Sequence, residues 1–423
     1  MSKNASIISP TLAPATRKSP DKKIWTGLHG SSSTIAIYQA AQQAQTPILL
    51  ITHDTPAALR LEHELSHFQA SDLPIVLFPD WETLPYDTFS PHQDIISQRL
   101  STLYQLSRLE KGIVIVPIST LIHKLAPKQF LETNSLMVKV GDKEDLHQLR
   151  QKLEANGYRN VDQVMEHGEF SARGAILDLY PMGSTSPYRL DFFDDEIDDI
   201  RIFDPETQRS LDKIPEIALL PAHEFPIDEA GINLFRSQYR ENFKSTIDKE
   251  SIYHQVSNGI MPAGIEYYLP LFFEQTNSLF DYLPTNTQVI LSGDIEEALA
   301  QYWHDIEYRF EDRKYDVTKP LLAPSQIFLT SEFFYSALKP FHRINIVEQV
   351  ANTEKSGVID YAVTALPNIT INHQLKQPFE LLNNFIASHG KNPVLFLAET
   401  QGRRESVLEV LKRNNLKPTE VAS

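Results

Sequence analysis

The sequence predicts a multidomain α/β protein. Its 423 residues suffice for two to four domains of ~100–200 residues each. Short apolar runs alternate with helical segments near the start of the chain, which is typical of a doubly wound parallel sheet. Three closely spaced strand-like runs in the next part of the chain indicate an antiparallel meander.

The first region alternates helix and strand from Lys23 to about Gln129. Thr55 has the character of an N-cap, and Pro56 would occupy the first helical position. The apolar runs are short enough to be buried strands. We expect helices over 31–43, from 55 onward and over 94–108, and strands over 47–52, 75–78 and 112–118.

The pattern changes between residues 134 and 219. A helix near 143–157 precedes strand-like runs over 173–180, 188–193 and 197–203, which are joined by turns at 183–187 and 194–196. This arrangement predicts a small α+β module.

Longer helical segments follow, over 234–243 and 295–310, with one strand over 288–292. A last strand over 394–398 and a helix over 403–414 indicate a smaller α/β unit. Because no further element follows this pair before residue 423, we expect the unit to be truncated.

Composition and charge limit the classes of function that the chain can have. The net charge is −16, so DNA binding should be weak unless a local basic patch exists. There is no cysteine, which excludes disulfides and thiolate metal sites. Residues 1–23 lack the apolar centre of a signal peptide, and no apolar run is long enough to span a membrane. We expect a cytoplasmic protein with a disordered tail.

Residues 27–34 read Gly-Leu-His-Gly-Ser-Ser-Ser-Thr and lie just before the first expected helix. They keep the frame of a Walker phosphate loop, with Gly27 at its start and Thr34 at its end. Ser32 replaces the second glycine, and Ser33 replaces the lysine that reaches the β- and γ-phosphates. A hydroxyl cannot neutralise a triphosphate, so we expect no ATP hydrolysis, although helix N–H groups could hold a lone anion. A plain serine-rich N-cap is the alternative interpretation.

Other catalytic patterns are weak. The 14 histidines show no metal-ligand spacing, and we expect no catalytic residue and no metal site. The acidic turn at 194–196 points its carboxylates in different directions, so we interpret it as solvated. We interpret His167, within 166–168, as structural.

Six segments carry a distinctive pattern. They span residues 80–93, 157–168, 173–183, 188–197, 220–226 and 262–267, and include Asp80-Trp-Glu-Thr-Leu-Pro-Tyr86 and Arg173-Gly-Ala-Ile-Leu-Asp-Leu-Tyr180. Taken together and in order, these segments resemble the transcription-repair coupling factors. The resemblance runs from about Ile24 to the end and is strongest from Asp80 to Pro270.

The resemblance implies a module similar to the first two domains of UvrB. A degenerate P-loop, helicase-like domain would be split in two pieces, with an α+β UvrA-binding domain inserted between them. Only about nine residues separate Tyr86 from the helix near Ile95, so we do not expect the long DNA-separating hairpin of UvrB-type proteins. The expected segments are a disordered tail over 1–23, the first piece over 24–132, the insert over 133–219, the second piece over 220–345 and a small α/β domain over 346–423.

Side chains alternate along a strand, so the run over 188–193 has two distinct faces. Tyr188, Leu190 and Phe192 share the face that suits a core. Arg189, Asp191 and Phe193 share the other. An outward phenylalanine beside an outward arginine is typical of a binding hot spot.

Arg173 begins the neighbouring expected strand and could join this face. By resemblance, Arg173, Arg189 and Phe193 match positions with which the family contacts UvrA. The alternative is that Phe193 packs under a helix while the arginines pair with Asp191 or Asp194. Two further pairs of residues could lie in surface contacts, but we favour ordinary structural interpretations for both. Trp81 and Phe89 would be packed aromatics, and Arg403–Arg404 would lie in a solvated helix turn.

The resemblance implies that this chain recruits UvrA to stalled RNA polymerase in transcription-coupled excision repair. The chain would need no cofactor. ATP and Mg²⁺ would serve a C-terminal translocase part, which would also bind RNA polymerase and double-stranded DNA. A C-terminal domain would mask the UvrA face in the resting protein. The rival hypotheses are a self-contained, divergent ATP-dependent DNA-remodelling enzyme and a structural spacer.

Overall fold

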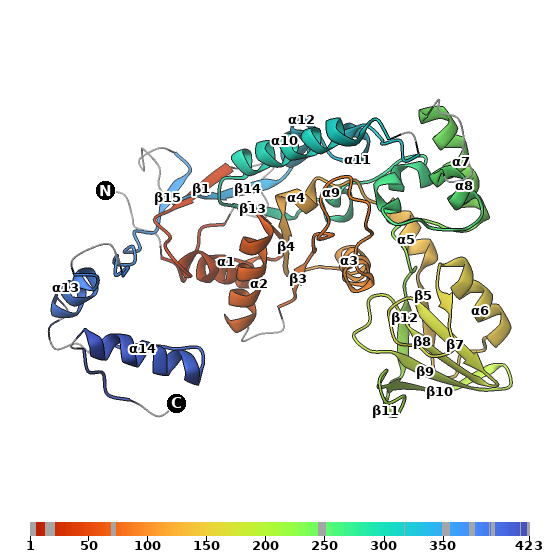
Figure 1. Cartoon of the computed structure of the whole chain (residues 1–423), viewed down its shortest axis with the longest axis horizontal. Coiled ribbons are helices and arrows are strands. Elements are labelled where there is room, and N and C mark those ends of the chain that lie inside the picture. The colour runs from red at the N-terminus through yellow and green to blue at the C-terminus, as the bar shows by residue number, and fades with distance from the viewer. Residues whose placement is uncertain are drawn as a thin grey trace. The chain divides into compact units, whose positions relative to one another are not determined.

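The structure is a computed structural model, and it describes residues 6–12, 22–68, 73–243, 251–316, 318–348, 356–371, 377–388, 390, 394–414 and 416–420. The chain forms two compact units, residues 1–363 and 364–423, and the first holds all of the sheets (Figure 1). No helix within the described ranges is long and apolar enough to cross a membrane.

A seven-stranded sheet lies at the centre of the first unit, in the order β15-β1-β14-β13-β2-β4-β3 (Figure 1). Every neighbouring pair is parallel, which confirms the predicted parallel sheet. Strands β13 and β14 come late in the chain, so segments on both sides of the insertion build this sheet. The strands are β1 (Lys22–Thr26), β2 (Ile48–Thr52), β3 (Ile75–Leu77), β4 (Ile113–Pro117), β13 (Gln288–Ser292), β14 (His342–Ile346) and β15 (Val358–Asp360).

Helices cover both faces of this sheet. Since successive side chains of a strand point to opposite faces, each strand contributes to both of the cores beneath these helices. Leu50 and Ile115 pack in one core with helices α1 and α2, whereas Leu49 and Val114 pack in the other with α3, α4, α10 and α12. Burial on both faces explains the uninterrupted apolar run of β2. The helices are α1 (Ser32–Gln43), α2 (Thr55–Phe68), α3 (Gln93–Leu106), α4 (Ile118–Leu121), α10 (Ile295–Arg313) and α12 (Ser331–Leu338).

The cap of α2 differs from the prediction by one residue. Ala57 N donates to Asp54 Oδ1 at 2.7 Å, so Asp54 caps the helix and Thr55 is its first residue. Aspartate and threonine are both favourable N-cap residues, and they stand next to one another at this helix start.

The inserted sheet has the order β11-β10-β9-β8-β7-β6 and is antiparallel except between β6 and β7. The predicted meander is confirmed, with more strands than expected. A separate antiparallel pair, β5 and β12, joins the start and the end of the insertion. The bounds are β5 (Leu136–Lys139), α6 (Leu146–Ala155), β6 (Arg159–Asn160), β7 (Glu169–Arg173), β8 (Ile176–Tyr180), β9 (Tyr188–Phe193), β10 (Glu196–Phe203), β11 (Ser210–Lys213) and β12 (Glu216–Leu219).

The expectation that Arg173 begins a strand is wrong. Arg173 ends β7, and Gly174, at φ +61°, turns the chain into β8. A two-residue hairpin needs such positive φ values, which glycine adopts without strain. The predicted strand over 173–180 therefore spans the end of one strand, a turn and a second strand.

A buried ion pair ties the end of the insertion to helix α3. Arg99 Nε donates to Glu224 Oε1 at 2.9 Å, and the two side chains are 1% and 3% exposed. Trp81 Nε1 donates to the other carboxylate oxygen at 2.9 Å. The guanidinium also lies 4.3 Å from the ring centroid of Phe78. This cluster fixes the segment that follows β12 against the first piece of the sheet domain.

The remaining helices of the first unit mostly lie between the insertion and β14. They are α5 (Lys128–Asn134), α7 (Glu229–Asn242), α8 (Ile252–Ser257), the 3-10 helix η1 (Ile265–Phe272), α9 (Leu279–Tyr282) and α11 (Pro324–Ile327). Within the segment expected to form a disordered tail, Ile7 and Leu12 pack against the core that contains α1. Residues 1–5 and 13–21 lie outside the described residues.

The second unit contains α13 (Glu380–Ser388) and α14 (Gln401–Arg413), and its described residues form no strand. The strand predicted over 394–398 is therefore wrong. The run is apolar, but Leu395 and Leu397 are 68% and 84% exposed, and no described strand pairs with it. An apolar run becomes a strand only where a neighbour takes its backbone hydrogen bonds.

Candidate functional site

The outer face of the inserted sheet presents Phe193, which is 77% exposed at the end of β9. Its neighbours Leu190 and Phe192 are buried on the opposite face. The predicted alternation is thus confirmed, and Phe193 does not pack under a helix. An aromatic ring held open to solvent on a regular strand is available for contact with a partner.

Arg189 lies on the same face and is held by a bidentate ion pair. Its Nε and Nη2 donate to the two carboxylate oxygens of Asp178 at 2.7 and 2.9 Å. Asp178 stands directly opposite Arg189 on β8, so the strand register makes this pair. The Asp178 carboxylate raises the pKa of Arg189 above its usual value. The sequence-based alternative, pairing with Asp191 or Asp194, is wrong for Arg189.

A second charged group lies beside this pair, around Asp199 of β10. Lys213 Nζ donates to its carboxylate at 2.8 Å and Arg201 Nε donates at 2.6 Å. These two cations hold the pKa of the Asp199 carboxyl below its usual range. Arg201 also lies 3.6 Å from Asp191, so the charges of this face fix one another in place.

Arg173, the last residue of β7, lies on the same face. It is exposed, and its guanidinium donates to the backbone oxygen of Asp162. Ile176 pairs with Arg173 on one side and with Asp191 on the other, and it is 38% exposed. Sequence reasoning missed Ile176, because its outward direction depends on where the hairpin turns.

The outer face therefore combines one exposed ring, one exposed isoleucine and three arginines on its strands, Arg173, Arg189 and Arg201. Diagonal neighbours on adjacent strands lie within ~7–8 Å, so Phe193 and Ile176 can contact one partner surface. An ion pair holds Arg189 in place before any partner arrives, and a hydrogen bond to the Asp162 backbone oxygen holds Arg173. This order lowers the entropy lost on binding. The arrangement suits protein docking and holds no set of groups for covalent chemistry.

The predicted phosphate loop lies between β1 and α1, at the carboxyl edge of the parallel sheet. Gly27 and Gly30 both have positive φ, +67° and +57°, so the loop does need glycine at these positions. A Cβ at Gly27 would meet Asp360 Oδ1 at 2.2 Å. A carboxylate thus lies against the start of the loop, where a phosphate would be repelled.

The loop hydroxyls are used by the protein itself. Ser32 Oγ donates to His29 O at 2.7 Å, and Ser33 Oγ donates to Gly30 O at 3.3 Å. Thr34 Oγ1, the position that holds Mg²⁺ in a working phosphate loop, donates to the Glu64 carboxylate. These bonds leave the residues at positions 32–34 poorly suited to a nucleotide.

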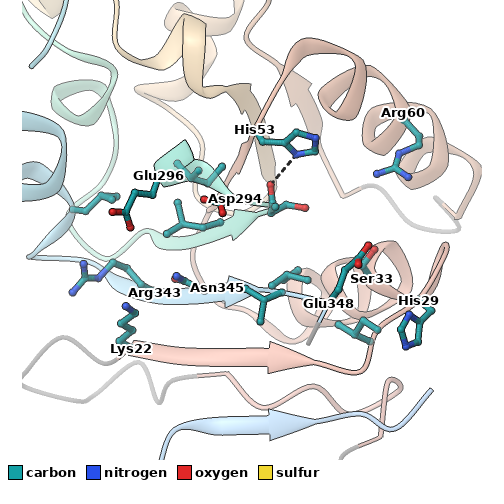
Figure 2. Close-up of a pocket in the computed structure, with 18 of the residues that line it drawn as sticks. Lys22, His29, Ser33, His53, Arg60, Asp294, Glu296, Arg343, Asn345 and Glu348 are labelled. Atoms are coloured by element: carbon teal, nitrogen blue, oxygen red, sulfur yellow. Dashed lines mark hydrogen bonds between the residues drawn. The ribbon is translucent and has the colours of Figure 1, made fainter. Parts of the chain in front are cut away.

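A pocket of about 840 Å³ adjoins this loop at the ends of β13 and β14. Figure 2 shows His29 and Ser33 at one end, and Lys22 and Arg343 at the other. Three carboxylates, those of Asp294, Glu296 and Glu348, also line it. Because carboxylates lie beside its positive groups, this pocket resembles an ordinary polar cleft more than a triphosphate site.

The structure also places the other sequence candidates, some buried and some exposed. His167 Nδ1 lies 2.8 Å from Asp94 Oδ1 and its Nε2 lies 2.8 Å from Ser184 O, contacts that are consistent with the structural interpretation. Trp81 is buried, as expected, but Phe89 is 70% exposed, so the packed interpretation of Phe89 is wrong. Arg403 and Arg404 are exposed in the first turn of α14, as predicted.

Comparisons with known proteins agree on one family. A family model described as "UvrB interaction domain" matches residues 136–225, and one described as "MFD, D3 domain" matches residues 385–423. A transcription-repair-coupling factor of Haemophilus influenzae is 47% identical over 95% of this chain, and that of Escherichia coli is 44% identical over 96%. The chain spans 35% of the length of each of these two relatives. A Bacillus subtilis transcription-repair-coupling factor is 29% identical over 72% of the chain and 27% of its own length.

Proposed function

Because the chain belongs to the family of transcription-repair-coupling factors and matches their N-terminal portion, we propose that it recruits the excision-repair protein UvrA. The observation that carries the proposal is the exposed ring of Phe193 beside ordered arginines, within the segment that matches the UvrB interaction domain. The docking residues are Arg173, Arg189 and Phe193.

The sheet domain around the insertion is, in this proposal, a degenerate helicase-like domain in two pieces that hydrolyses no ATP. Ser33 in the place of the lysine, the internally bonded hydroxyls and the Asp360 carboxylate support this view. A titration of the chain with ATP and Mg²⁺ by calorimetry should release no heat of binding. Saturable binding with turnover would favour a self-contained ATP-dependent enzyme instead.

The full-length relatives suggest the setting in which this docking acts. We propose that a C-terminal translocase part uses ATP and Mg²⁺, binds double-stranded DNA and displaces stalled RNA polymerase. A C-terminal domain would cover the docking face until then. The isolated chain should therefore bind UvrA without activation.

The test is binding of the purified chain to UvrA, measured by calorimetry and by co-elution. Replacing Phe193 or Arg189 by alanine should each weaken binding by about 2 kcal/mol or more, the size of a hot-spot contact. Phe89→Ala is the matched control, because it removes an equally exposed ring outside the insertion. Failure of the wild-type chain to bind, or equal loss with Phe193→Ala and Phe89→Ala, would refute the proposal.

A further inference from the structure

Helices α7 and α8 lie next to one another in the helical part of the first unit (Figure 1). Side chains of both helices line a groove of about 630 Å³. The side chains that line it include two arginines and a histidine, and none is acidic. This is unusual in a chain whose net charge is −16. The lining residues are Asn233, Arg236, Ser237, Arg240, Tyr253, His254, Ser257 and Asn258.

Helical spacing gathers these groups on one side of α7. Asn233, Arg236, Ser237 and Arg240 recur at intervals of three and four residues, so they form one stripe along the helix. Phe235 and Tyr239 lie on the opposite side and are buried. The core therefore fixes the rotation of α7, and the polar stripe must face the groove.

Arg236 is held in position by neutral acceptors. Its Nε donates to Ser257 Oγ at 3.0 Å, and its Nη2 donates to Ser257 O at 2.7 Å. Its Nη1 donates to Asn233 Oδ1 at 3.1 Å. A guanidinium has five N–H donors, so two remain for a ligand. Among the described residues, all the hydrogen-bond acceptors of Arg236 are neutral, and no carboxylate forms an ion pair with it.

Arg240 provides a second positive charge one helical turn farther along the groove. Its guanidinium carbon lies 5.1 Å from the ring centroid of Tyr253, which is itself 7% exposed. The ring supports the guanidinium and offers no free face for stacking a base. Within the described part of the chain, the contact of Arg240 is with this ring, and no carboxylate forms an ion pair with it.

We propose that this groove binds the phosphate backbone of double-stranded DNA. Two arginines one helical turn apart, with Cβ atoms about 5–6 Å from each other, can contact neighbouring phosphates of one strand. Asparagine, serine and tyrosine side chains are usual partners of phosphate oxygens. The groove is open to solvent, which suits an extended polyanion better than a small enclosed ligand.

The side chains of the groove also predict which kind of DNA it prefers. It presents no exposed aromatic ring on which single-stranded bases would stack, so duplex DNA is the expected ligand. Contact through phosphates alone carries no sequence information. Binding should therefore be independent of sequence and should weaken steeply as salt increases.

The test uses the full chain and a fluorescent DNA duplex, with binding followed by anisotropy at low and at physiological ionic strength. Ser237→Glu places a carboxylate between the two arginines without removing either of them. It should weaken duplex binding at least about tenfold. The slope of log K against the logarithm of salt concentration should become shallower by about one or two, since each lost phosphate contact changes this slope by about 0.9. Arg240→Glu should act in the same direction.

Matched controls separate this groove from a general change in charge. Ser237→Ala changes the same exposed position without adding charge and should bind as the wild type does. Arg403→Glu makes the same charge reversal as Arg240→Glu on the second unit and should also leave duplex binding unchanged. Thermal melting of each variant checks that the fold is kept.

Three outcomes would overturn the proposal. The wild-type chain could fail to bind the duplex at low salt, or Ser237→Glu could bind it as tightly as Ser237→Ala does. Alternatively, inorganic phosphate could raise the melting temperature of the wild type but not of Ser237→Glu, while duplex binding is equal in both. That last result would assign the groove to a free anion and not to DNA.

Discussion

Removal of the Glu224 carboxylate should be among the most destabilising single changes in this protein. The carboxylate accepts hydrogen bonds from Arg99 and Trp81, and both members of the ion pair are almost fully buried. In Glu224→Ala the Arg99 guanidinium would stay behind as a buried charge, with Pro79 O as its remaining close acceptor at 2.8 Å.

The expected magnitude follows from that unpaired charge. Breaking a buried ion pair by deleting one partner costs about 3–5 kcal/mol, because the remaining charge is neither solvated nor neutralised. Trp81 Nε1 would also lose its acceptor, which adds about 1–3 kcal/mol for an unsatisfied buried donor unless water enters. We expect Glu224→Ala to lower the free energy of unfolding by about 4 kcal/mol or more.

Urea unfolding of the chain, followed by far-ultraviolet circular dichroism and by tryptophan fluorescence, measures this loss. Glu216→Ala is the control, because Glu216 forms an exposed pair with Lys139 at 2.7 Å. Exposed pairs contribute about 0–1 kcal/mol. The double variant Arg99→Met with Glu224→Leu should lose much less than the sum of its single changes, since it leaves no buried charge. Additive losses, or a loss below about 1 kcal/mol in Glu224→Ala, would refute the reasoning.

Two further predictions concern pH and packing. Burial raises the pKa of the Glu266 carboxyl from about 4.5 in the unfolded chain to about 7 in the folded chain. The contribution of this carboxyl to folding stability is therefore complete below the unfolded pKa of about 4.5 and is lost as pH rises through about 7. Glu266→Gln should therefore gain stability relative to the wild type, by up to about 3 kcal/mol between pH 4.5 and pH 8 in urea unfolding; a pH-independent difference would contradict this. Gly231→Ala should lower the free energy of unfolding by about 1–3 kcal/mol although alanine favours helices, because its Cβ would lie 2.6 Å from Pro226 O. Gly402→Ala, whose Cβ meets no atom within 4 Å, is the control and should not destabilise α14.

The sequence predicted the centre of the parallel sheet because β2, β4 and β13 are apolar on both faces. It missed β1 and β14, which lie beside one another in the same sheet. Lys22, Arg343 and Asn345 line the pocket, so these strands carry polar residues that interrupt the apolar pattern. A strand that borders a pocket cannot be recognised by hydrophobicity alone.

The outer face of the inserted sheet was predicted only in part, for a similar reason. Alternation within one strand was enough to place Phe193 outward and Phe192 inward. The partner of Arg189 and the exposure of Ile176 depend on the register between strands, which the hairpin at Gly174 sets. The groove between α7 and α8 was also missed by sequence analysis. Its two arginines lie on α7, but the rest of its lining comes from α8, and the sequence does not show that the two helices pack together.

Site-specific crosslinking tests the central claim most directly. A photoreactive benzoylphenylalanine placed at Phe193 should crosslink to UvrA when the two proteins are mixed and illuminated, because this ring is proposed to lie in the contact. The same group at Phe89, which is similarly exposed outside the insertion, should give no crosslink. A product from position 89 but none from position 193 would contradict the assignment of the outer sheet face as the docking surface.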